Sequence, residues 1–213
     1  MQATVRRLSV VSLTPPARRR LIRVVRPNNM PPVKPDDPLR IFTWLGGGGA
    51  YLAPLNLVWS TDGMEADLAR FRQAAAHLSS EETYWRWLFR GAWREQLCAS
   101  TCALVTTSRR FLTELKDAVQ AGTWVGPQLI VAATLLHPSE AAPWLYEGGM
   151  SALTRGRFKD FGAFSTMAAT TGIDQTLPVV TPSELSPLEH DEFALGQSIA
   201  ASQHQFWAHY IST

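Results

Sequence analysis

Charged residues are scarce in this sequence, and several features that would reveal a function are missing from it. Asp, Glu, Lys and Arg make up 18% of the 213 residues, whereas hydrophobic residues make up 46%. This composition excludes a chain that is disordered throughout, because it supplies enough apolar side chains for a core. No run approaches the roughly 18 consecutive apolar residues that a membrane-spanning helix needs. We therefore expect a folded, cytoplasmic protein with no membrane span.

Cysteine is also scarce, which limits disulfide and metal chemistry. Cys98 and Cys102 are the two cysteines, and both fall on one expected helix. A disulfide between adjacent turns of one helix would be strained, so the pattern predicts free, buried thiols. The pair could share a metal with His137, but a closed zinc site needs a fourth ligand that the sequence does not offer. We expect no metal and no cofactor.

Sequence motifs for nucleotide binding or nucleophilic catalysis are missing too. The four glycines Gly46 to Gly49 are followed by Ala50-Tyr51 rather than by Lys-Ser or Lys-Thr, so they do not form a phosphate-binding loop. No Gly-x-Ser-x-Gly elbow occurs. These absences favour a binding protein. An enzyme remains open as an alternative, with a site assembled from dispersed titratable residues such as His77, Glu81, His137 and Asp160.

Basic charge is concentrated at the beginning of the chain. Residues 1–40 hold nine Lys and Arg but two Asp, a net charge of +7, which leaves −5 for the remainder because the whole chain carries +2. Repeated prolines interrupt this segment, so residues 1–38 are expected to be a disordered, basic Pro/Arg-rich tail. Two alternatives are an arm that touches nucleic acid or acidic lipid, and a true start at Met30. Residues 39–63 are expected to form an extended segment or small hairpin with a Gly-rich hinge.

From residue 64 to residue 213 the apolar spacing is helical, which predicts an all-α domain. Within it, a short helix from Glu140 to Tyr146 is expected to end at the pair Gly148-Gly149. Gly-x-Trp occurs at Gly91 and Trp93 and again 31 residues later at Gly122 and Trp124. The pair Gln96-Leu97 likewise recurs at Gln128-Leu129, 32 residues later. A period of this length is typical of stacked helix pairs.

The recurring positions are interpreted as structural. Trp93 and Trp124 are expected to be buried between helices, the alternative being an exposed aromatic platform. Gln96 and Gln128 are expected to bond the end of a neighbouring helix, the alternative being contact with a ligand. Trp124 is expected to lie where two helices of one unit pack.

The stretch from Gly91 through Leu97 and from Gly122 through Ala133 resembles HEAT-like helical repeat proteins of bacteria, over residues 80–172. The resemblance implies a short helical solenoid that binds another protein, as an immunity or adaptor factor. It carries over no functional residues, and the period is shorter than the usual HEAT length of about 40 residues. Nucleic acid binding is expected only through the N-terminal arm.

Overall fold

The structure is a computed structural model in which residues 40–45, 49–55, 57, 64–172, 177–179 and 184–213 are described. The chain divides into two units, Met1–Pro31 and Pro32–Thr213, and every described residue belongs to the second. Across the described residues the regular elements are helices, and no strand occurs. The all-α class is therefore confirmed for this part of the chain.

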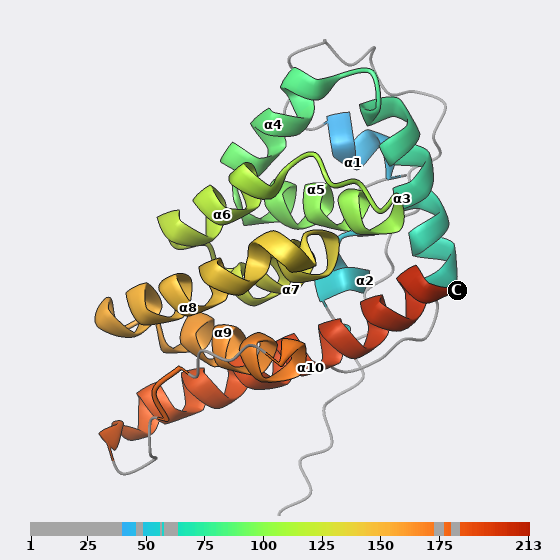
Figure 1. Cartoon of the computed structure of the whole chain (residues 1–213). Coiled ribbons are helices and arrows are strands. Elements are labelled where there is room, and N and C mark those ends of the chain that lie inside the picture. Colours follow the sequence, from blue (N-terminus) through green and yellow to red (C-terminus); the bar gives the residue numbers. More distant parts are fainter. Residues whose placement is uncertain (1–39, 46–48, 56, 58–63, 173–176, 180–183) are drawn as a thin grey trace, which may run out of the picture. The chain divides into compact units, whose positions relative to one another are not determined.

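Ten helices are assigned within the described ranges (Figure 1). They are α1 (Arg40–Trp44), α2 (Leu52–Leu55), α3 (Met64–Leu78), α4 (Glu82–Arg90), α5 (Trp93–Val105), α6 (Leu112–Ala121), α7 (Gly126–Leu136), α8 (Pro138–Thr154), α9 (Phe158–Thr171) and α10 (Pro187–Ser212).

Consecutive helices form pairs, and the pairs lie side by side. α4 packs on α5, α6 on α7, and α8 on α9. α5 also contacts α7, and α7 contacts α9, so these three helices form one layer. α4, α6 and α8 follow one another along one side of that layer (Figure 1). α3 packs against α5, and α10 packs against α9 and α7.

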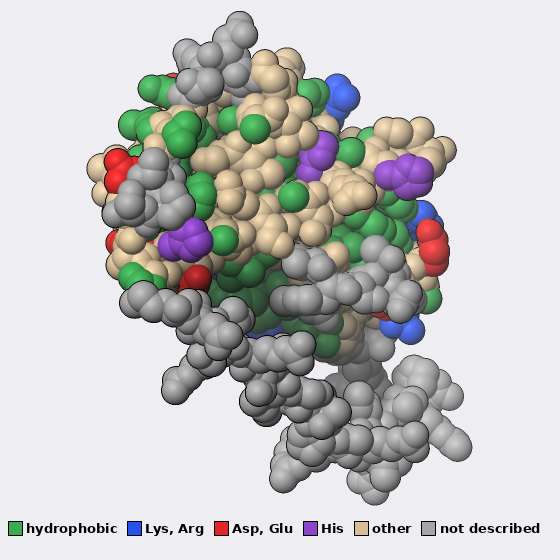
Figure 2. Space-filling view, turned by 90° about the horizontal axis from the view of Figure 1, so that it is seen from below, with side chains coloured by type: hydrophobic (Ala, Val, Ile, Leu, Met, Phe, Trp, Pro, Cys, Tyr) green, Lys and Arg blue, Asp and Glu red, His purple; other side chains and the backbone are tan. Residues whose placement is uncertain are grey.

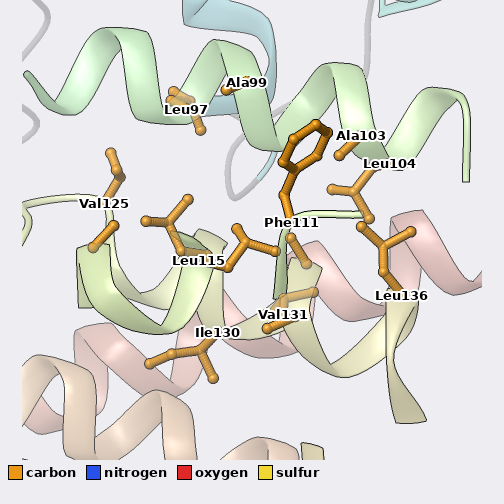
Figure 3. Packing of buried hydrophobic residues seen from close by; sticks show 14 of the residues in the cluster. Leu97, Ala99, Ala103, Leu104, Phe111, Leu115, Val125, Ile130, Val131 and Leu136 are labelled. Atoms are coloured by element: carbon orange, nitrogen blue, oxygen red, sulfur yellow. The ribbon is translucent and has the colours of Figure 1, made fainter. Parts of the chain in front are cut away.

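The core is centred on α7, whose segment Leu129–Ala133 is fully buried. Leu97 and Leu104 of α5 point toward α6 and α7, and Leu104 lies beside Leu136 of α7 (Figure 3). α7 can be apolar on every side because it touches its own pair partner α6, helices of the two neighbouring pairs, and α10. The helix pairs are thus joined by one continuous apolar cluster.

The expectation of an extended segment or hairpin before residue 64 is wrong where the structure describes that region. Residues Arg40–Trp44 and Leu52–Leu55 are short helices. Ile41 and Leu45, one helical turn apart, are both fully buried, and the Ile41 N–H donates to the Tyr84 hydroxyl oxygen at 3.1 Å. Strand propensity of the aromatic and branched residues was outweighed by these contacts with α3 and α4.

The expected end of a helix at Gly148-Gly149 is also wrong, because α8 continues to Thr154. Both glycines are explained by packing instead. A Cβ on Gly148 would come 2.5 Å from the Phe164 ring, and one on Gly149 would come 2.7 Å from the Leu177 side chain. The missing side chains let α9 and the following segment approach the α8 backbone.

Most of α10 carries no charged side chain. From Phe193 to Thr213 the sequence contains no Asp, Glu, Lys or Arg, and Leu195 is 44% exposed. Figure 2 looks onto this side of the molecule, where charged side chains lie mainly near the margin. The charged residues of α10 are confined to its first two turns, which hold Glu189, Asp191 and Glu192. None of the described helices is both long enough and apolar enough to cross a membrane.

Several predictions concern residues outside the described ranges. They are the tail at 1–38, most of the glycine hinge at Gly46 to Gly48, and the turn before α3. These stay predictions, as does the basic arm as a nucleic-acid contact.

Candidate functional site

The two recurring tryptophans are in contact, but Trp124 is not buried. Trp93 is the first residue of α5, and Trp124 lies in the turn between α6 and α7. Their ring centroids are 5.1 Å apart with an interplanar angle of 58°. Trp93 is half-buried, whereas 58% of Trp124 is exposed. The expectation that Trp124 is a core residue is therefore wrong, and the alternative of an exposed aromatic platform describes it better.

The turn from Gly122 to Val125 explains why Trp124 faces outward. Gly122 ends α6 in the left-handed region with φ of 87°, which turns the chain away from the helix axis. Val125 then fills the core and is fully buried. The neighbouring Trp124 ring lies on the surface against Trp93.

Gln96 holds this turn in place. Its side-chain amide donates to the carbonyl oxygens of Phe89 and Gly91 at 3.1 Å, which satisfies the end of α4 as expected. Its amide oxygen accepts from the Thr123 hydroxyl at 2.5 Å. Gln128 is also buried, but its amide oxygen accepts no hydrogen bond from a described residue. The two glutamines are therefore not equivalent.

Cationic side chains flank the exposed rings. The Arg94 guanidinium lies 4.4 Å from the Trp93 ring centroid and 5.6 Å from that of Tyr51, which meets Trp93 edge-on at 5.8 Å. The Lys159 ammonium lies 5.0 Å from the Trp124 ring and donates to the Trp124 carbonyl at 2.6 Å. We call this cluster of Tyr51, Trp93, Arg94, Trp124 and Lys159 the aromatic edge. Cation–π contacts of this kind hold the rings in place at the surface.

The titratable residues considered for a dispersed active site are not brought together. His77 stacks on Trp44 at 5.3 Å, and Glu81 forms an ion pair with Arg40 next to it. His137 and Asp160 lie at opposite ends of α7, about 15 Å apart. The geometry does not support one site built from the four.

His137 and Asp160 are nevertheless unusual, because each is a buried titratable group. The His137 Nε2 and the Asp160 Oδ1 lack hydrogen-bond partners among the described residues. Burial lowers the pKa of His137, and burial raises the pKa of Asp160 to about 6. Sequence reasoning named both residues as candidates but had no signal for their burial.

Cys98 and Cys102 are free and fully buried within α5. Burial raises the pKa of both thiols well above the usual range, so they remain protonated and act as small core side chains. Among the described residues, no group of three or more His, Cys, Asp or Glu side chains is placed to hold a metal ion.

No protein-family model matches this sequence, and no match to it was found among curated proteins or among solved structures. The resemblance to HEAT-like proteins is therefore untested by relatives, and the candidate site stands on geometry alone.

Proposed function

We propose that this chain is a short HEAT-like helical repeat protein of the bacterial type, which binds another protein as an immunity or adaptor factor. The observation that carries the proposal is the exposed Trp124 ring of the aromatic edge. Trp, Tyr and Arg are the residues most enriched at the energetic centres of protein interfaces. An exposed tryptophan in a turn that is hydrogen-bonded to Gln96, beside a second ring and two cations, has that composition.

The helix pairs support the repeat part of the proposal. α5, α7 and α9 begin at Trp93, Gly126 and Phe158, a spacing close to the recurrence seen in the sequence. Gly91 and Gly122 each follow the last residue of the outer helix, α4 or α6. Equivalent positions in successive units therefore meet at one edge, where Trp93 reaches Trp124. Stacked helix pairs commonly present such an edge or face to a partner.

The partner is expected to be a protein with a net positive charge. Residues 41–213 carry −5, because the basic residues are concentrated before them. Complementary charge would speed the encounter, and the Trp124 ring would supply the contact that holds the complex together.

Replacing Trp124 by alanine tests the proposal. Trp124 is mostly exposed, so the variant should lose no more than about 1 kcal/mol of stability, or about 2–4 °C in Tm. A buried Trp would lose about 3–5 kcal/mol. The protein with either tryptophan or alanine at position 124 would be cross-linked to its neighbours in its native host, and the captured polypeptides would be compared. Loss of a hot-spot residue should weaken capture of the true partner by at least about 30-fold.

Trp87→Ala provides the matched control. Trp87 is 40% exposed and stacks on Tyr84, away from the aromatic edge. A partner captured by wild type and by Trp87→Ala, but not by Trp124→Ala, would support the proposal. It would be rejected if every captured polypeptide survived both substitutions, or if Trp124→Ala melted as early as a core variant.

A further inference from the structure

A groove separates α6 from α8 and is not part of the aromatic edge. Its volume is about 540 Å³, within the range of ligand-binding clefts. One wall is the face of α6 from Thr113 to Gln120, and the other is the face of α8 from Glu140 to Ser151. α6 packs on α4 and α7, and the groove keeps it from packing closely on α8.

The groove has an aromatic wall where small residues leave room. Gly148 has no side chain, and the Phe164 ring of α9 lies against its backbone. Trp144 meets this ring edge-on, with centroids 5.0 Å apart, and is itself half-buried. The Trp144 ring is therefore fixed by packing and still borders the groove.

Acidic side chains on the two walls lack partners. Asp117 of α6 and Glu147 of α8 are exposed and make no hydrogen bond or ion pair with any described residue. Glu140, a third acid at the groove, accepts a hydrogen bond from the Ser139 hydroxyl at 2.8 Å. This bond is the main cause of the lowered pKa of Glu140, so that carboxylate is ionised at neutral pH.

The basic side chains at the groove are already engaged. Arg157 donates to the Val119 carbonyl at 2.5 Å and pairs with Asp160 at 3.5 Å. The Lys116 ammonium lies 5.7 Å from the Trp144 ring centroid, and its acceptor is the Glu140 carbonyl at 3.5 Å. Both contacts of Lys116 are at the long end of their range, so this side chain is loosely held.

We propose that the groove binds an arginine side chain of a partner polypeptide, with the guanidinium stacked on Trp144 and paired with Asp117 and Glu147. Lys116 occupies the position over the ring in the free protein and moves away when the arginine enters. The inference rests on the proposed function, since the guest is a protein segment, but it uses no residue of the aromatic edge.

Arginine fits this groove better than other cations do. Its planar guanidinium can stack on an indole while its edge donates to carboxylates, whereas an ammonium acts as a point charge. The groove volume exceeds that of one side chain, so residues flanking the arginine are accommodated as well. This favours a polypeptide over a free amino acid.

The position of Lys116 predicts that substitutions at the groove change arginine binding in opposite directions. Removing an acid from the groove should weaken binding, because an attractive charge is lost. Replacing Lys116 by glutamine should strengthen binding, because it removes a like charge and frees the Trp144 ring. A surface that attracts basic peptides by overall charge alone would not single out Lys116 in this way.

The test is a titration of the full chain with a short capped peptide that contains one central arginine. Binding is followed by the indole N–H resonance of Trp144, assigned by its absence in Trp144→Phe. Glu147→Gln and Asp117→Asn should each weaken binding by about three- to tenfold, and Lys116→Gln should strengthen it by about the same factor. Glu65→Gln, an exposed acid on α3, is the matched control and should bind like wild type.

The same peptide with citrulline in place of arginine keeps the shape but removes the charge, so it should not bind. Equal binding of the citrulline peptide, or weaker binding by Lys116→Gln, would overturn the inference. If free arginine bound as tightly as the peptide, the inference that the ligand is a polypeptide would be overturned. Trp124→Ala should bind the peptide normally. If the groove does not bind arginine, the Trp124 test of the proposed function is unaffected. If the Trp124 test fails, the titration of the groove is likewise unaffected.

Discussion

Trp124 and Val125 are neighbours in the chain, yet Val125 is fully buried and Trp124 is 58% exposed. The turn after Gly122 directs the smaller side chain into the core, where full burial contributes about 1.5–3 kcal/mol. The larger ring then packs on Trp93 and under the Lys159 ammonium. At the residue scale, two adjacent residues thus differ in role: Val125 stabilises the core, and Trp124 is a candidate binding residue.

Asp160 is a second residue whose surroundings decide its behaviour. It is buried against Gly126 at the beginning of α7, where a Cβ on residue 126 would collide with its Oδ1. Burial is the main cause that raises its pKa to about 6, while Arg157 and Lys159 act to lower it and Glu192 of α10 raises it slightly. The carboxyl group is therefore easier to protonate in the folded protein than in the unfolded chain.

This difference predicts a pH dependence of stability. Because the pKa of Asp160 is raised in the folded state, the folded protein holds the proton more tightly. The stabilisation that protonated Asp160 gives the folded state is fully present below about pH 4 and is lost as the pH rises through about 6. Relative to Asp160→Asn, the wild type should therefore lose about 2–3 kcal/mol of stability over this window. Thermal melts of both proteins between pH 4 and pH 7 measure it, and a constant difference, or one of opposite sign, would contradict the prediction.

At the scale of elements, the contact between α9 and α10 requires glycine on both helices. A Cβ on Gly196 of α10 would collide with the Lys159 carbonyl, and one on Gly162 of α9 would collide with the Phe193 carbonyl. Backbone atoms on both sides cannot move away as a flexible side chain could. The crossing therefore depends on both glycines, although glycine lowers helix propensity.

We predict that Gly196→Ala destabilises the protein by about 1–3 kcal/mol, because overpacking at the crossing outweighs the gain in helix propensity. Urea denaturation would show a lower midpoint with an unchanged slope. Gly49→Ala serves as the control, because its added Cβ meets nothing within 4 Å. An alanine at Gly196 that stabilised the protein would mean that α9 and α10 are not in this close contact.

At the scale of the whole molecule, the buried apolar side chains form one cluster that extends from Ile41 in α1 to Trp207 in α10. The helix pairs are therefore not independent in their packing. A cluster of this extent predicts that the described body unfolds as one cooperative unit rather than pair by pair. Cys98 and Cys102 lie within it and report on its opening.

The thiols should react with a disulfide reagent only when the body unfolds. Both are fully buried, and burial raises their pKa, so the native protein presents almost no thiolate. Native protein should be labelled at least about 1,000-fold more slowly than protein in denaturant, where both thiols react. Ser198→Cys, which adds an exposed thiol on α10, should be labelled rapidly and shows that the reagent is active. Fast native labelling of Cys98 or Cys102 would indicate local opening of α5.

Local pattern was sufficient to predict the helical body. The apolar spacing from Met64 onward matches the observed helices because a helix buries residues three and four apart whatever lies opposite it. The recurrence of Gly-x-Trp predicts equivalent positions for Trp93 and Trp124. Their rings are in contact, but Trp93 begins α5 whereas Trp124 lies in the turn before α7. The expectations failed where a single residue was interpreted without its surroundings. The pair Gly148-Gly149 predicts the end of a helix, whereas in the structure the two glycines make room for Phe164 and Leu177.

The sequence by itself therefore determined the helical class and the apolar faces of the helices, because these depend on spacing within one segment. Only the tertiary structure decided that Arg40–Trp44 is a helix, that Trp124 is exposed, and that α6 and α8 enclose a groove with two unpaired acids. Each of these depends on what another segment of the chain places beside the residue. Exposure, burial and unpaired charge are properties of neighbours in space, and a periodic pattern along the chain does not contain them.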